Sequence, residues 1–130
     1  IMAGKIIADT LEHSTAGSVT TDYVVNGSAK AWSLFDQTGT TEIKESFNCS
    51  SVTDHSTGET GHTLTNNMSS GNYCNPASSG EQTGGGNRSM GINGNRGQAS
   101  SSSTNIMNST LTNNRIDDDR LNIAWLGDLA

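Results

Sequence analysis

The clearest strand pattern in the chain lies in VVNGSAKAWSLFDQTGTTEIKESFNC, which runs from Val24 to Cys49. Small side chains alternate with larger ones over Ala29–Leu34, and Ile43 and Phe47 fall on one face of a second alternating segment. Alternation with a period of two residues is typical of a strand that is buried on one face. The intervening Gln37–Thr40 contains a glycine and suits a turn. The pattern predicts an antiparallel hairpin whose two faces are both partly covered.

The composition favours the same class of structure. Hydrophobic residues make up 31% of the chain, whereas Ser, Thr, Asn and Gly together make up 63 of the 130 residues. These small polar residues favour turns, loops and strands over long helices. The length suits a single domain. We therefore expect an all-β fold, a small antiparallel β-sandwich of jelly-roll type with a thin core.

Further strands are expected on both sides of the hairpin. Ser18–Val25 has the Thr, Tyr and Val content of a strand, and Asn26-Gly27 after it suits a tight turn. His62–Asn66 and Arg120–Leu129 also alternate, the second most clearly. The bulky members of all these segments form the expected core, which consists of Trp32, Phe47, Leu64, Ile123 and Trp125.

The N-terminal residues are expected to form an extended arm over 1–17, which serves attachment and oligomerisation, followed by a head domain over 18–130. Ile6, Ile7 and Leu11 have no local apolar partners in this arm. A helix there would need a cap and a sustained helical period, and neither is clear. The low apolar content of the whole chain likewise favours burial against other copies.

The segment Ser78–Ser103 is rich in Gly and Ser and holds few aliphatic residues. Such a composition cannot offset the entropy of ordering by burial, so a long surface loop is expected. The loop is either merely disordered or a variable contact surface, and both alternatives stay open. If it is a contact surface, the candidate contact residues are Gly84, Asn87, Arg88, Asn93, Asn95 and Arg96. Pro76 cannot donate to a strand ladder, so any strand near it is expected to be short or at an edge.

Three motifs resemble the core of a domain found in phage tail-fibre and related virion proteins. They are NGSAKAW at Asn26–Trp32, SFNCSSVTD at Ser46–Asp54 and MSSGNY at Met68–Tyr73. The ending at Leu121–Asp128 is also similar to that of the family. The resemblance covers roughly Val24–Tyr73 and this ending, and the segment between them is unmatched.

This resemblance implies a function. It implies a non-enzymatic virion structural protein, the head of a tail fibre or spike, that contacts a host cell-surface glycan or protein. It also implies other virion proteins as partners, a homotrimer, assembly in the host cytoplasm and a place in the virion. An alternative from another class is a capsid-decorating or adaptor protein anchored through its N-terminal arm. A fragment-sized carbohydrate-active enzyme is a weaker alternative.

No metal or cofactor site is predicted. His55 and His62 flank an expected turn, but no Cys, Asp or Glu stands at a spacing that would complete a tetrahedral site, so an exposed pair is the preferred interpretation. Asp117–Asp119 lacks the alternating oxygen ligands and the central glycine of a calcium loop. We expect it to be a solvated turn flanked by Arg115 and Arg120.

Catalysis and nucleic-acid binding are not expected either. The chain has no nucleophile-elbow motif, and its few aromatic residues do not suit a glycan-cleaving cleft. A net charge of −6 without a Lys or Arg cluster disfavours binding to a phosphate backbone. Cys49 and Cys74 have neither redox nor zinc spacing. In a virion protein assembled in a reducing cytosol they are expected to be free, buried thiols.

Overall fold

A computed structural model describes residues 4, 6–80, 88–92, 102–110 and 114–130 of the chain. In chain order, the elements are β1 (Thr10–His13), β2 (Gly17–Thr20), α1 (Thr21–Gly27), β3 (Ala29–Asp36), β4 (Glu42–Phe47), β5 (Cys49–Ser56), β6 (Glu59–Leu64), β7 (Ala77–Gly80), β8 (Arg88–Ile92), β9 (Ser103–Thr110) and β10 (Arg120–Leu126). The chain is therefore mostly β, as its composition predicts.

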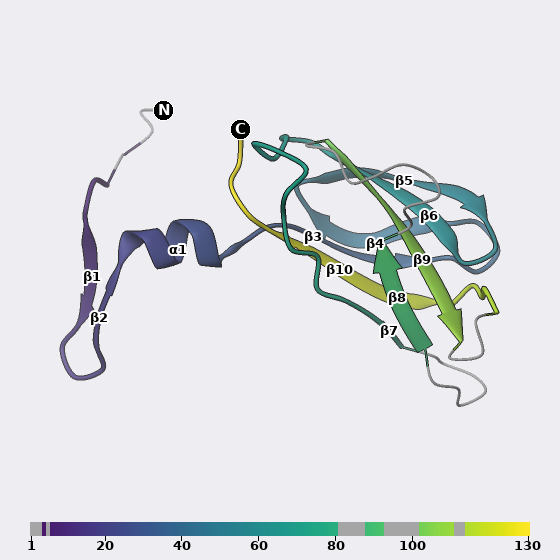
Figure 1. Cartoon of the computed structure of the whole chain (residues 1–130), viewed down its shortest axis with the longest axis horizontal. Helices are drawn as coiled ribbons and strands as arrows, with labels where there is room; N and C mark the ends of the chain where they lie inside the picture. Colours follow the sequence, from purple (N-terminus) through teal and green to yellow (C-terminus); the bar gives the residue numbers. More distant parts are fainter. Residues whose placement is uncertain (1–3, 5, 81–87, 93–101, 111–113) are drawn as a thin grey trace.

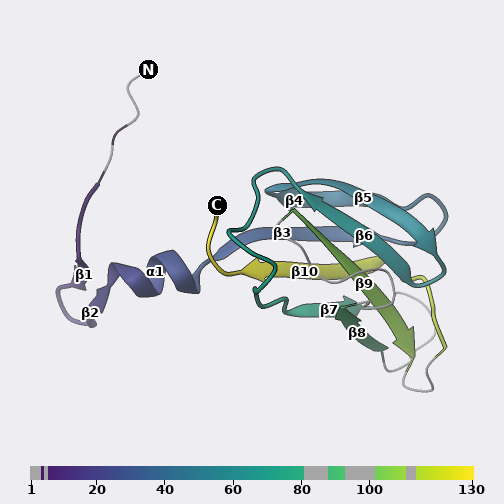
Figure 2. The same cartoon turned by 45° about the horizontal axis from the view of Figure 1, so that its top comes forward.

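Two four-stranded sheets form the body of the described structure. Their strand orders are β4-β3-β10-β7 and β5-β6-β9-β8, and every pairing is antiparallel. The sheets lie one over the other (Figures 1 and 2). The expected small all-β fold is confirmed. The jelly-roll connectivity is not confirmed, because the successive strands β3 and β4, and likewise β5 and β6, are neighbours within one sheet.

The hairpin predicted from the central stretch is formed by β3 and β4. Trp32 lies opposite Phe47 at one end and Asp36 lies opposite Glu42 at the other. Gly39 has a φ of 65° in the connecting turn, a conformation that glycine adopts without steric cost. The prediction for this part of the chain is confirmed.

The core lies between the two sheets. Its buried apolar members are Ala31, Phe35, Leu64, Met68, Leu121, Ile123 and Trp125. Trp125 lies opposite Ala31 in the β10–β3 register, so a large ring and a small side chain share one level of the core. Because β10 alternates strictly, Leu121, Ile123 and Trp125 all point inward. The expected burial of Leu64, Ile123 and Trp125 is confirmed.

The expected burial of Trp32 and Phe47 is wrong for the single chain. Their side chains are 38% and 57% exposed. Ala31, Ser33 and Phe35 occupy the inward positions of β3, so Trp32 must point to the other face of the sheet. Phe47 lies directly opposite Trp32 and therefore shares its outward direction.

The chain passes from the first sheet to the second at Asn48. This residue has a φ of 55° and is the only non-glycine residue with a positive φ in the part of the chain that the structure describes. Asparagine tolerates this left-handed conformation better than most residues. Its side-chain amide donates to the backbone carbonyls of Lys30 and Asn66, each at 3.1 Å. The bend is thus held by side-chain hydrogen bonds to both sheets.

An N-terminal extension precedes the sandwich. It contains a small hairpin, β1 with β2, followed by α1, and it projects from one end of the body (Figures 1 and 2). The strand predicted over Ser18–Val25 is wrong beyond Thr20, because α1 begins at Thr21. The turn predicted at Asn26-Gly27 is also wrong, since both residues belong to the helix. The backbone N–H of Thr21 donates to the carbonyl of Asp9 at 2.9 Å and ties the start of the helix to the residue just before β1.

The motif Met68–Tyr73 runs beside the C-terminal end of the chain. Ser69 N–H donates to the carbonyl of Asp128 at 2.8 Å, and Cys74 and Leu126 exchange two backbone hydrogen bonds of 2.9 Å. A Cβ added at Gly127 would lie 3.0 Å from Tyr73 Cβ, so the close approach needs a glycine. Beyond this segment comes β7, an edge strand of four residues, as the proline before it predicts.

Candidate binding face

The outer face of the β4-β3-β10-β7 sheet carries a row of apolar side chains. Phe47, Trp32 and Ala124 lie side by side on three neighbouring strands. Pro76 continues the row just before β7, because its carbonyl accepts the N–H of Ala124 at 3.0 Å. This apolar row (Phe47, Trp32, Ala124 and Pro76) crosses the whole sheet and includes two aromatic rings that remain in contact with water.

A polar row lies next to the apolar row on the same face, two residues away along each strand. Glu45, Leu34, Asn122 and Ser78 are register partners across the same four strands. The carboxylate, amide and hydroxyl side chains in this polar row are all exposed. Within this row Glu45 therefore borders Phe47 and Asn122 borders Ala124, whereas the apolar Leu34 borders Trp32.

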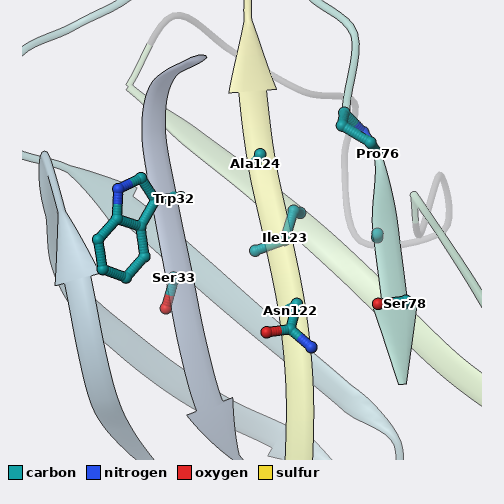
Figure 3. A pocket seen from close by; sticks show the side chains of 8 residues that line it. Trp32, Ser33, Pro76, Ser78, Asn122, Ile123 and Ala124 are labelled. Atoms are coloured by element: carbon teal, nitrogen blue, oxygen red, sulfur yellow. The ribbon is translucent and has the colours of Figure 1, made fainter. Parts of the chain in front are cut away.

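A hollow of about 340 Å³ lies over β10 between these rows. Figure 3 shows Trp32 on the side of β3 that faces away from β10, with the broad face of its ring toward the viewer. Asn122 and Ala124 lie on β10, with Pro76 and Ser78 on its far side. The small Ala124 side chain leaves the space open, since the Trp32 ring on the neighbouring strand is turned away from β10. Sites for small ligands fall at about this volume and above.

A cluster of charged side chains lies at the other end of this sheet. Lys44 pairs with Asp36 at 3.2 Å, and Thr38 donates to the Asp36 carboxylate from its backbone N–H at 2.7 Å and its hydroxyl at 2.6 Å. Partial burial raises the pKa of Asp36, but these hydrogen bonds outweigh it and leave the pKa below its usual value. Arg120 occupies an outward position of β10, across from Gly80. Of the residues that line the hollow, none carries a charge.

His62 lies inside the sandwich and not in an exposed pair with His55, so that interpretation of the sequence is wrong. Its ring meets Phe35 edge-on, with centroids 4.5 Å apart, and lies 5.8 Å from the ring of Trp125. Burial lowers the pKa of His62 from 6.5 to about 4, because the apolar surroundings disfavour the charged imidazolium. His62 is therefore neutral at physiological pH and fills the core as an aromatic ring.

The three aspartates Asp117–Asp119 do not form a freely solvated turn. Asp118 is buried, and Asp117 accepts the backbone N–H of Gly58 at 2.6 Å. Arg115 forms an ion pair with the buried Glu59, which also accepts a hydrogen bond from Ser56 at 2.8 Å. This acidic segment therefore holds the chain before β10 against the β5–β6 turn.

Both cysteines are free, as the sequence analysis expects. Cys49 is buried, and burial raises the pKa of its thiol, which lowers its reactivity. Cys74 is exposed, so the expectation that both thiols are buried is wrong for this residue.

Among the described residues, no three His, Cys, Asp or Glu side chains come together in a way that could hold a metal ion. Nor does any helix in the described ranges have the length and apolar character needed to cross a membrane.

The candidate receptor contacts fall mostly outside the described residues. Gly84, Asn87, Asn93, Asn95 and Arg96 all lie there, and only Arg88 is placed, at the start of β8. The expected uninterrupted loop over Ser78–Ser103 is wrong, because residues 78–80 belong to β7 and Arg88–Ile92 forms β8. Contact by the residues between these strands stays a prediction from sequence. Sequence alone does not reveal this outer face, because the size of Trp32 and Phe47 favours their assignment to the core. Phe35 lies three residues after Trp32, so the two side chains point to opposite faces of the strand. Assigning Phe35 to the core would have placed Trp32 outside.

No protein-family model, curated protein or solved structure matches the chain.

Proposed function

We propose that this chain is a non-enzymatic structural protein of a phage virion. In this proposal the β-sandwich is the head of a tail fibre or spike and contacts a glycan or protein on the host surface. The N-terminal extension attaches the head to other virion proteins. The protein is assembled in the host cytoplasm and carried in the particle.

The observation that carries the proposal is the exposed apolar surface of the N-terminal extension. The large apolar side chains of its described residues are exposed by 39% or more, and they are Ile6, Ile7, Leu11, Val19, Tyr23, Val24 and Val25. The helix α1 buries none of its residues and has only seven. A helix this short is marginal without packing, so the extension is suited to contact with another chain.

The motifs that resemble tail-fibre domains also support the proposal, because they hold the sandwich together. Asn48 makes the bend between the sheets, and Met68–Tyr73 pairs with the C-terminal segment. Residues with such roles specify a fold, so their occurrence together supports a common fold more strongly than isolated matches would.

We also propose that the working unit is a homotrimer. Three copies around an axis would cover the apolar side chains of the extension and keep exposed strand edges from recruiting further chains. At about 25 cal/mol per Å² of apolar surface, burial of a few hundred Å² per chain adds several kcal/mol. That is comparable to the whole stability of a small domain.

Competition with phage adsorption tests the proposed function. Purified protein is mixed with host cells before the phage is added, and the fraction of adsorbed phage is measured. We expect the protein to lower adsorption in a concentration-dependent way. Unchanged adsorption at saturating protein would contradict host contact and favour the second candidate, a capsid-decorating or adaptor protein that the extension anchors to the particle.

A further inference from the structure

We propose that the outer face of the β4-β3-β10-β7 sheet binds a neutral oligosaccharide, with one sugar ring stacked on Trp32 and the next seated in the hollow over Ala124. This inference deepens the proposed function, because it names the chemical class of the host ligand and the surface that takes it. It uses only residues that the structure describes.

The aromatic side chains supply the stacking surface. Trp32 turns the broad face of its indole outward, and Phe47 lies directly opposite it on β4. The face of an aromatic ring is negatively polarised, and it attracts the weakly positive C–H groups on the apolar side of a sugar ring. Two exposed aromatic rings side by side on a rigid sheet are pre-organised for such contact, because little side-chain freedom is lost on binding.

The hollow and the polar row supply the remaining contacts. Ala124 is the floor between Trp32 and Pro76, and the Asn122 amide and Ser78 hydroxyl border it. An amide both donates and accepts hydrogen bonds, as does a hydroxyl, and this matches the mixed character of sugar hydroxyl groups. A few polar groups beside an apolar surface are what fixes the orientation of a small ligand.

The charges around the hollow favour a neutral ligand. No charged side chain lines the hollow itself. Glu45 in the polar row would repel an acidic sugar, and the Lys30 ammonium already donates to the carbonyl and hydroxyl of Ser28, at 3.0 and 2.8 Å. An anion placed over Ala124 would lose water without gaining a partner, which is costly.

The size of the site favours an oligosaccharide over a second copy of this chain. The apolar row crosses four strands, a width of about 14 Å at the usual strand spacing. A stable protein interface buries about 800 Å² on each partner, far more than one row of four side chains provides. A short sugar chain lying across the strands can contact the whole row.

The test is binding of the full chain to an array of neutral oligosaccharides built from glucose, galactose, mannose and N-acetylglucosamine, with acidic oligosaccharides printed beside them. We expect retention on at least one neutral oligosaccharide. That compound is then titrated in solution and followed by tryptophan fluorescence, which should change because Trp32 is exposed while Trp125 is buried.

Two variants locate the site. Trp32→Ala should weaken binding about tenfold or more. Asn122→Ala should weaken it severalfold, and because Asn122 is exposed this change leaves the fold intact even if the first variant does not fold. Thr53→Ala is the control, since it removes an exposed side chain on β5, in the other sheet, and its affinity should equal that of the unchanged chain.

The inference is overturned if no neutral oligosaccharide is retained, if both variants bind as tightly as the unchanged chain, or if acidic oligosaccharides bind better than neutral ones. It is also overturned if Trp32→Ala dissociates an assembly of the chain in sedimentation, because the face would then be an interface between copies. Failure here is separable from failure of the proposed function. A protein that blocks adsorption but binds no sugar retains the function, and one that binds sugar but does not block adsorption retains the glycan site alone.

Discussion

The side-chain oxygen of Asn48 accepts the backbone N–H of Asn66 at 2.7 Å. It also accepts the side-chain N–H of Asn66 at 3.0 Å, while the backbone carbonyl of Asn48 accepts the N–H of Thr65 at 3.1 Å. The residue that bends the chain between the sheets is thus bound to the two residues that follow β6. This arrangement explains how a positive φ is maintained at a residue with a side chain.

Replacing Asn48 should therefore separate backbone strain from hydrogen bonding. Asn48→Ala loses the side-chain bonds and keeps a Cβ in a left-handed conformation, and it should lower the free energy of unfolding by about 2–4 kcal/mol. Asn48→Gly loses the same bonds without the strain and should cost about 1 kcal/mol less than alanine. Urea unfolding measures both values. Equal losses for alanine and glycine would show that the conformation carries no strain.

The two large rings at Trp125 and Phe47 should differ strongly in their contribution to stability. Trp125 is fully buried, so Trp125→Ala should lower the free energy of unfolding by about 3–5 kcal/mol. Phe47 is 57% exposed, and Phe47→Ala should cost about 1 kcal/mol. Thermal or urea unfolding compares the two variants with the unchanged chain. A loss at Phe47 as large as that at Trp125 would contradict its outward position.

Stability should depend on pH through His62. Its pKa is about 4 in the folded chain against 6.5 as the ordinary value, so between these values the unfolded chain binds more protons than the folded one. The free energy of unfolding therefore keeps its full value above pH 6.5 and falls by about 3 kcal/mol as the pH drops toward 4. His62→Leu should lose less stability over this range than the unchanged chain. Carboxylates titrate in both proteins, so the difference between the two curves isolates His62, and parallel curves would contradict its burial.

The N-terminal extension should control assembly. Sedimentation equilibrium of the full chain should give a mass near three times the monomer mass of 13.6 kDa. Removing residues 1–11, or changing Val24 and Val25 to Ser, should lower that mass, because both changes remove exposed apolar surface of the extension. A folded monomer across micromolar concentrations of the full chain would contradict the trimer.

Much of the sandwich could be predicted from sequence, because apolar and polar residues alternate clearly in the strands that form the core. Leu121, Ile123 and Trp125 alternate with smaller or polar residues, and all three are buried. The hairpin turn at Gly39 was predictable because only a few residue types suit its conformation.

The candidate site could not be predicted in the same way. Size alone suggests that Trp32 is buried, yet Ala31 lies inside because it must share its level with the ring of Trp125. That relation depends on pairing between strands that are far apart in sequence. His62 was open to a better prediction, since it alternates in phase with the buried Leu64. The helix at Val24 and Val25 could not be predicted, because β-branched residues favour strands. In addition, α1 buries no residue, so it has no apolar face with a helical period.

The proposed place of the protein in a phage particle is the central claim, and imaging its location tests that claim most directly. Antibodies raised against the full chain and marked with gold can be applied to intact particles of the phage that the proposed function implies and viewed by electron microscopy. The proposed function predicts label at the outer ends of tail fibres or spikes. Label spread over the capsid, or particles that carry none of the protein, would contradict it.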